Sequence, residues 1–334
     1  MRVLAAIIPL CTALLCLCIT LPMPAMAAPS KPVLVYMLAN KTDGSFIDSA
    51  RKGAELASRD FNATFKEIRL RSSDNVLKRL DTLARKGYSP IISVGYQSIM
   101  PILQLAEKYP DTKFTVVDGL VPPLFSNVQS IIFKDHEGAF LVGMIAAYTN
   151  KTGKVGFIGG IDIPVIRNFS HGYTQGIFHV NPSIEVLTDM VGSDNSAWSD
   201  TANAYRLATA QYKAGADIIF AAAGGAGIGV LQAAKDQAQY AIGVDVNQNS
   251  LQPGYVLTSM VKRVDVAVYK TLEMIHQKKW AHGIKYLGLK EGALDFSVDI
   301  HNRMLLSDEA LDRVMTAKEH IVNGLLDVEM YSPR

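Results

Sequence analysis

The sequence predicts an α/β protein made of two doubly wound, parallel-sheet lobes joined by a hinge. Short, mostly apolar runs alternate with helical segments along almost the whole chain, which is typical of parallel sheets covered on both faces. The pattern restarts after a polar turn at 150–154, and the segment beyond about residue 257 is too short for a third unit. Because 334 residues exceed one comfortable core, two lobes are the expected arrangement.

The first unit begins with an apolar strand and a helix whose apolar residues recur at helical spacing. Its expected strands are Pro32–Leu38, Phe65–Arg71, Pro90–Val94, Lys113–Val117 and Val128–Phe133, and its expected helices are Ser45–Asn62, Asn75–Lys86, Ile99–Tyr109 and His136–Asn150.

The second unit repeats this alternation, and a tail of different character follows it. Strands are expected at Val155–Ile158, Ile184–Val191, Ile218–Ala223 and Tyr240–Val244, with helices at about Phe169–Val180, Trp198–Ala214 and Gly229–Gln237. In the tail we expect a long helix at Leu257–Lys279, extended pairs with a Gly292 turn at Ile284–Asp299, and a helix at Ser307–Asn323 capped by Ser307. The expected lobes are 28–150 plus about 258–285, and 151–257 plus about 286–334.

Residues 1–27 have the layout of a secretory signal peptide. Arg2 precedes an uncharged stretch from Val3 to Leu21, and Ala25-Met26-Ala27 offers small residues for cleavage after position 27. The alternative reading is a membrane anchor, because about 19 apolar residues nearly span a bilayer. We expect the cleaved form, which is soluble in the periplasm.

The cysteines and the net charge narrow the function classes. Cys11, Cys16 and Cys18 all lie in the expected signal, so the mature chain has neither disulfides nor thiolate metal sites. A lipid-anchored cysteine is the remaining alternative, although leucine stands where lipoprotein signals favour small residues. Loss of Arg2 lowers the net charge from +2 to +1, which leaves no basic stripe for nucleic acid.

Polar, aromatic and glycine residues follow the expected strands of both units. Parallel sheets bind ligands outside the carboxyl ends of their strands, so these residues are candidates for one shared cleft. They are Asp43, Ser45, Phe46, Tyr96, Asp118, Phe169, Gly224, Gly225 and Asp245. Each has a structural alternative: Asp43 and Ser45 can cap a helix, with Asp48 completing a capping box, while both phenylalanines can belong to the core.

No enzyme signature is evident. The glycines at 224–229 miss the dinucleotide-binding spacing, and the chain has no phosphate loop, no His-Glu-x-x-His and no nucleophile elbow. The seven histidines are scattered, and we expect His136 and His171 at the surface. Lys134-Asp135-His136-Glu137 is interpreted as a solvated helix start. We therefore expect no catalytic residue, no metal and no cofactor.

Several segments, in order, resemble the basic membrane protein family of ABC-transporter binding proteins, also called purine nucleoside receptor A-like. They are Asp43-Gly44-Ser45-Phe46, the run from Glu137 to Gly143, Phe157-Ile158-Gly159-Gly160 with Phe169 and Gly172, Ala216–Phe220 leading into Gly224-Gly225, and Ile242-Gly243-Val244-Asp245 followed by Leu257–Lys262. The resemblance covers nearly the whole mature chain.

The resemblance implies a type I periplasmic-binding-protein fold and a purine nucleoside or base as the ligand. Phe46 and Phe169 would sandwich the base, Asp245 would accept hydrogen bonds from ribose hydroxyls with Lys262 beside it, and Asp118 would contact the ligand from the first lobe. Trp198 completes the candidate set. Family members that bind nucleosides carry asparagine after the Ser-Phe pair, whereas this chain has Ile47. Flavins and other planar molecules therefore stay open as ligands.

The implied partner is an ABC permease in the inner membrane, to which a monomeric binding protein delivers its ligand. Two other functions stay open. One is a binding protein that reports ligand occupancy to a membrane receptor, and the other is a periplasmic nucleoside-processing enzyme.

Overall fold

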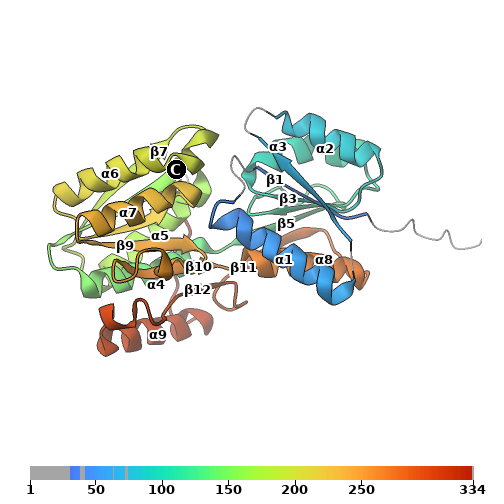
Figure 1. The fold of residues 1–334 in the computed structure, drawn as a ribbon. Helices are drawn as coiled ribbons and strands as arrows, with labels where there is room; N and C mark the ends of the chain where they lie inside the picture. Colours follow the sequence, from blue (N-terminus) through green and yellow to red (C-terminus); the bar gives the residue numbers. More distant parts are fainter. Residues whose placement is uncertain (1–30, 38–41, 63, 72–73, 333–334) are drawn as a thin grey trace, which may run out of the picture.

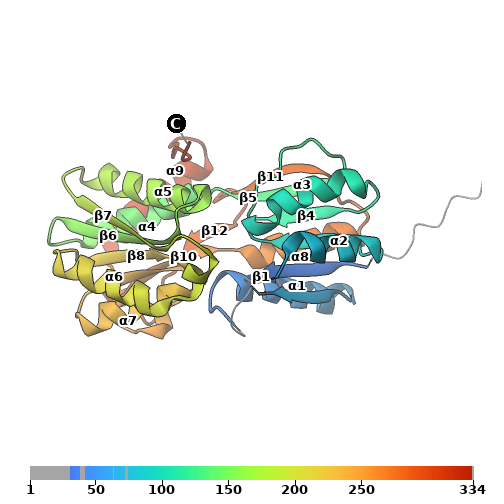
Figure 2. The ribbon, with the colours of Figure 1, turned by 90° about the horizontal axis from the view of Figure 1, so that it is seen from above.

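The computed structural model describes residues 31–37, 42–62, 64–71 and 74–332, and its two lobes lie side by side (Figure 1; Figure 2). The predicted signal peptide at 1–27 lies outside the described residues. Within the described ranges, no helix combines the length and the apolar composition needed to cross a bilayer.

The first lobe is built on a six-stranded parallel sheet with strand order β11-β5-β4-β3-β1-β2. Its strands are β1 (Val33–Met37), β2 (Lys66–Leu70), β3 (Ile91–Val94), β4 (Phe114–Val117), β5 (Val128–Phe133) and β11 (Gly283–Leu287). Its helices are α1 (Phe46–Phe61), α2 (Val76–Arg85), α3 (Ile99–Lys108) and α8 (Val264–His276). Leu34 and Tyr36 join the core under α1 and α8, whereas Val33 and Val35 join the core under α2 and α3, as alternation along a strand requires.

The second lobe repeats this plan with strand order β12-β10-β9-β8-β6-β7. Its strands are β6 (Lys154–Ile161), β7 (Glu185–Gly192), β8 (Ile218–Ala222), β9 (Tyr240–Asp245), β10 (Val256–Lys262) and the antiparallel β12 (Leu294–Phe296). Its helices are α4 (Asp135–Thr149), α5 (Pro164–Val180), α6 (Thr201–Lys213), α7 (Gly227–Asp236) and α9 (Asp308–Val322). Helix α4 packs against α5, and α6 against α7 (Figure 1). The prediction of a doubly wound α/β fold is confirmed.

The chain crosses between the lobes at Lys134, at Arg263 and through residues 288–293. Lys134 N donates to the carbonyl oxygen of Leu287 at 2.9 Å, and Arg263 N donates to that of Ala293 at 2.8 Å. Leu289 N donates to the Glu137 carboxylate at 2.8 Å. These bonds tie the crossings to one another, so they form one connected hinge.

The tail differs most from the sequence prediction. The expected helix Leu257–Lys279 is strand β10 followed by α8, since β10 is buried on both faces and therefore lacks the alternation that marks a half-exposed strand. The segments expected to pair within Ile284–Asp299 do not pair with each other. Strand β11 lies beside β5 in the first sheet, and β12 lies beside β10 in the second.

The expected lobe boundary at residue 150 also shifts. Helix α4 packs against α5, β10 and α9, all elements of the second lobe, although the prediction assigned it to the first. Three glycines permit this contact: a Cβ on Gly143, Gly172 or Gly176 would lie 2.0–2.3 Å from a carbonyl oxygen of the facing helix. The helix start predicted to be solvated is buried here, with Asp135 0%, His136 4% and Glu137 7% exposed.

Candidate functional site

A cavity of about 340 Å³ lies between the lobes, at the carboxyl ends of strands from both sheets. In each sheet the strand order reverses at the first strand of the lobe, β1 or β6, which is where doubly wound sheets bind their ligands. All of the predicted ligand residues except Ser45 line this cavity. They are Asp43, Phe46, Tyr96, Asp118, Phe169, Trp198, Gly224, Gly225, Asp245 and Lys262.

Aromatic side chains form much of the cavity wall. Phe46 begins α1 and is half-buried, while Phe169 lies on α5 and is 3% exposed. The Phe169 ring packs against Phe220 with centroids 6.2 Å apart, so it serves both the core and the cavity. Helix α5 begins at Pro164, earlier than predicted, because proline is favoured at a first helical position.

Lys262 is the centre of a buried charge cluster. Its Nζ lies 2.8 Å from an Asp118 oxygen and 3.0 Å from an Asp135 oxygen, and the side chain is 1% exposed. Burial lowers the pKa of Lys262, but the three carboxylates of Asp118, Asp135 and Asp245 raise it by more than burial lowers it. The net pKa therefore lies above the ordinary value. The lysine therefore stays charged.

The ammonium group of Lys262 also lies among three aromatic rings. Its Nζ is 5.5 Å from the Phe46 centroid, 5.1 Å from that of Phe169 and 4.8 Å from that of Phe133. Cation–π attraction at such distances favours a charged amine. The Phe46 and Phe169 rings thus flank the charged cluster, which places apolar faces and polar groups side by side in one cavity.

Asp118 and Asp245 occupy equivalent places in the two lobes. Asp118 directly follows β4 and Asp245 ends β9, and both have left-handed backbone angles, with φ of 65° and 67°. Residues other than glycine rarely adopt this conformation, and such strain clusters at functional sites. Burial raises the pKa of Asp245 to about 6, against the lowering effect of Lys262 and of the Ser45 hydroxyl.

Ser45 departs from its predicted place. It is fully buried and its hydroxyl donates to the Asp245 carboxylate of the other lobe, so it neither lines the cavity nor caps α1. Asp43 caps the helix instead, accepting from the backbone N–H groups of Ser45 at 3.0 Å, Ile47 at 2.8 Å and Asp48 at 3.1 Å. Burial raises the pKa of Asp43, although these donors lower it.

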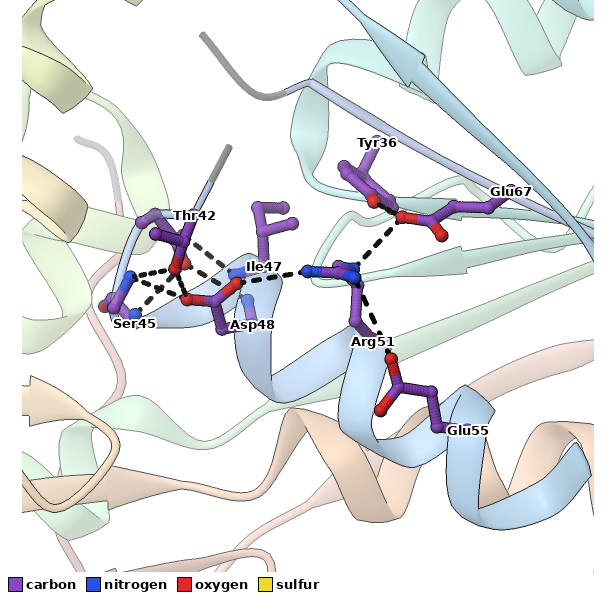
Figure 3. Close-up of polar contacts among 10 residues, drawn as sticks. Tyr36, Thr42, Ser45, Ile47, Asp48, Arg51, Glu55 and Glu67 are labelled. Atoms are coloured by element: carbon purple, nitrogen blue, oxygen red, sulfur yellow. Dashed lines mark hydrogen bonds and ion pairs between the residues drawn. The ribbon is translucent and has the colours of Figure 1, made fainter. Parts of the chain in front are cut away.

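A surface network holds this first-lobe segment in place (Figure 3). The Asp48 carboxylate accepts from Gly44 N at 2.8 Å and from the Thr42 hydroxyl. Arg51, one turn further along α1, lies 3.7 Å from Asp48 and 3.1 Å from Glu67, and Glu67 in turn accepts from the Tyr36 hydroxyl. The network connects the cavity-lining segment to β1 and β2.

Two polar side chains that line the cavity, one from each lobe, are hydrogen-bonded to each other. The Tyr96 hydroxyl donates to Asn195 Oδ1 at 2.7 Å, and burial raises the pKa of Tyr96. Trp198 lies on a 3₁₀ turn, Asn195–Ser199, and not in the predicted helix, because the Asp200 side chain starts α6 by accepting from Asn203 N. A Cβ on Gly160 would lie 2.3 Å from the indole ring, so glycine makes room for it.

Sequence reasoning missed part of the site. Asp135 was interpreted as part of a solvated helix start, and Asn195 carried no signal because it sits in an irregular segment. Ile163, Val165 and Ile166 also line the cavity, and nothing in their apolar character separates them from core residues. Among the described residues, no group of three or more His, Cys, Asp or Glu side chains is arranged to hold a metal ion.

Comparison with known proteins identifies the family. The family model for PnrA-like ABC transporter substrate-binding proteins matches residues 32–330. Basic membrane protein A of Borreliella burgdorferi is 32% identical over 287 residues, covering 84% of this chain and 82% of the relative. An uncharacterized lipoprotein of Pyrococcus furiosus is 30% identical, covering 80% of this chain and 69% of the relative.

Solved structures agree with that assignment. A solute-binding protein of an ABC transporter system from Aeropyrum pernix aligns with a TM-score of 0.82 and 25% identity, covering 91% of this chain and 94% of that one. A periplasmic solute-binding protein from Actinobacillus succinogenes with bound D-allose aligns with a TM-score of 0.60 and 16% identity, which shows the fold alone. The chain belongs to the PnrA-like family of extracytoplasmic ABC transporter substrate-binding proteins.

Proposed function

We propose that this substrate-binding protein binds a purine nucleoside or nucleobase in the interlobe cavity and delivers it to an ABC permease. The observation that carries the proposal is the pairing of aromatic faces with a buried carboxylate in one cavity. Phe46 and Phe169 line it from opposite lobes, and Asp245 lines it at the end of β9. A planar base can stack on the aromatic rings, and the hydroxyl groups of a ribose can donate hydrogen bonds to the carboxylate.

The expected energies fit a nucleoside. Stacking of a base on an aromatic side chain contributes roughly 1–3 kcal/mol and tolerates different bases. Hydrogen bonds to a charged acceptor contribute about 1.5–3 kcal/mol each. Lys262 supports the ionised form of Asp245, because its positive charge lowers the pKa that burial has raised.

The base end of the ligand is held less specifically. Ile47 lines the cavity and is buried, and its side chain offers neither a donor nor an acceptor. We therefore infer that the protein distinguishes ribose from no ribose more sharply than adenine from guanine. Replacing Ile47 with the asparagine of the nucleoside-binding relatives would add a polar group beside the base.

Native mass spectrometry of the purified protein identifies a retained ligand directly. Calorimetry then compares inosine with hypoxanthine on Asp245→Ala and on Asp162→Ala. Asp162 follows a strand of the same sheet, but its carboxylate pairs with Arg167 at the surface. We expect Asp245→Ala to weaken inosine at least tenfold and hypoxanthine little, with Asp162→Ala matching wild type. Equal loss for both ligands contradicts the ribose assignment.

A further inference from the structure

Ser45 stands at the start of α1 but takes no part in capping that helix. Its side chain is 0% exposed, and the backbone N–H groups that a capping serine would serve are bonded to Asp43 instead. The hydroxyl is therefore available for another partner. It donates to Oδ2 of Asp245, which belongs to the opposite lobe.

Gly44, the residue before Ser45, is bonded to the segment that follows Asp245 in the second lobe. Gln248 Nε2 donates to the carbonyl oxygen of Gly44 at 3.2 Å, while Gln248 Oε1 accepts from Val244 N at 3.0 Å. A Cβ on Gly225 would lie 3.4 Å from the carbonyl oxygen of Asp43, so the backbones approach closely there as well. The segment 43–45 of the first lobe is thus docked on the second lobe next to Asp245.

The Ser45 bond also determines what Asp245 offers to a ligand. Among the described residues, the Ser45 hydroxyl is the one side-chain donor bonded to this carboxylate. Among the described residues no hydrogen bond to Oδ1 of Asp245 is made, and Asp245 lines the cavity, so we infer that Oδ1 accepts from a ligand. A carboxylate with one fixed oxygen cannot rotate freely, so the second oxygen is held in a defined direction.

We propose that Ser45 is a positioning residue for ligand binding, which orients Asp245 toward the ligand and couples that orientation to closure of the two lobes. Ser45 itself touches no ligand. The expected effect of Ser45 on ligand affinity rests on the proposed function. Its expected effect on lobe closure does not depend on the identity of the ligand.

The charges around Asp245 determine how the coupling responds to pH. Lys262 from β10, Asp43 from the segment before α1 and Asp118 at the end of β4 face Asp245, and Asp135 of α4 lies behind Lys262. The ionised carboxylate accepts hydroxyl donors best, so affinity should fall as pH drops through the pKa of Asp245, about 6. Because the Ser45 donor lowers that pKa, its loss should move the fall in affinity to higher pH.

The test compares Ser45→Ala with Ser49→Ala. Ser49 is also buried, lies one turn along the same helix, and accepts from Asp265 N of α8 within the first lobe. Titration calorimetry with inosine between pH 5 and 8 should show about a tenfold weaker affinity at neutral pH for Ser45→Ala, and a pH dependence shifted upward. Ser49→Ala should keep the wild-type affinity and pH profile, whatever its effect on stability.

Two further measurements distinguish a failure of the Ser45 proposal from a failure of the proposed ligand class. In a double-mutant cycle, Ser45→Ala should have little effect in an Asp245→Ala background, because the carboxylate that it positions is already gone. Small-angle scattering of the ligand-free proteins should give a larger radius of gyration for Ser45→Ala than for wild type and Ser49→Ala. If wild type binds neither inosine nor hypoxanthine, the ligand class is wrong, and scattering alone decides the closure role. Scattering curves and pH profiles that are the same for both serine variants overturn the proposal.

Discussion

At the residue scale, the two phenylalanines of the cavity are the sharpest test of ligand stacking. Phe169→Ala and Phe46→Ala should each weaken a ring-bearing ligand by roughly 1–3 kcal/mol, which is about tenfold to a hundredfold in affinity. Phe178→Ala is the matched control, since Phe178 lies on the same helix as Phe169 but is exposed. Calorimetry gives the affinities. Unchanged affinity in both cavity variants would make these rings core residues only.

Phe169 also packs against Phe220, so its replacement disturbs the core as well as the cavity. Urea unfolding separates the two effects, because a lower free energy of unfolding with unchanged affinity reports packing alone. Phe46 is half-buried at the start of α1 and is therefore the cleaner probe of stacking.

Among the acidic residues of the site, Asp118 and Asp245 could be predicted from the sequence, whereas Asp135 could not. Asp118 and Asp245 directly follow or end buried strands, a position that marks them as candidates. Asp135 stands at the start of a helix in a run of four charged or titratable residues, which is the usual pattern of a solvated helix start. Its burial follows from the packing of α4 against α5, β10 and α9 of the second lobe, and that packing is a tertiary contact without a local signal.

At the element scale, the contact between α4 and α5 depends on small residues. A Cβ on Gly176 would lie 2.0 Å from the carbonyl oxygen of Phe140, so Gly176→Ala should force the helices apart and cost about 1–3 kcal/mol or more. Gly227→Ala is the control. Its Cβ would meet Ala221 at 3.5 Å, an ordinary contact, and alanine favours a helix over glycine by up to about 1 kcal/mol.

Urea unfolding of both variants measures the difference. Gly176→Ala should lower the midpoint of unfolding, while Gly227→Ala should leave it unchanged or raise it. A Gly176→Ala variant as stable as wild type would mean that α4 and α5 separate without loss of packing.

The elements that local patterns define were predicted well, and those that depend on pairing partners were not. Strands such as Ile91–Val94 and Ile218–Ala222 are short apolar runs between helices, so they stand out in the sequence. Strand β10 is buried along nearly its whole length and only Arg263 separates it from α8, so neither alternation nor a turn marks where the strand ends and the helix begins. Strands β11 and β12 pair with different sheets, a choice fixed by the hinge crossings and not by their own residues.

At the scale of the whole molecule, the start of the mature chain remains a prediction. The Ala25-Met26-Ala27 site predicts a protein that begins at Ala28 and is freely soluble in the periplasm. An acylated cysteine is the specific alternative. N-terminal sequencing and intact mass of the exported protein decide between them. A lipid on Cys16 or Cys18 would contradict the prediction.

The balance of charge in the cavity predicts which class of ligand the two lobes accept. Asp43, Asp118 and Asp245 line it together with a single lysine, Lys262, whose charge is already shared with Asp118 and the buried Asp135. A phosphate group entering this cavity would face carboxylates without a free cation among the described lining residues. Neutral nucleosides should therefore bind, and nucleotides should not.

Thermal unfolding with a panel of ligands tests this at the level of the whole fold. A ligand at a hundredfold excess over its Kd stabilises the folded state by about 2.7 kcal/mol, which for a protein of about 300 residues is a rise in Tm of roughly 4 °C. Adenosine, inosine and guanosine should each raise the Tm to a similar extent, because stacking and the ribose contacts are shared. Their 5′-monophosphates should leave it unchanged. If a monophosphate raises the Tm as much as its nucleoside, the phosphate lies outside the charged cluster, and the ligand enters the cavity base first.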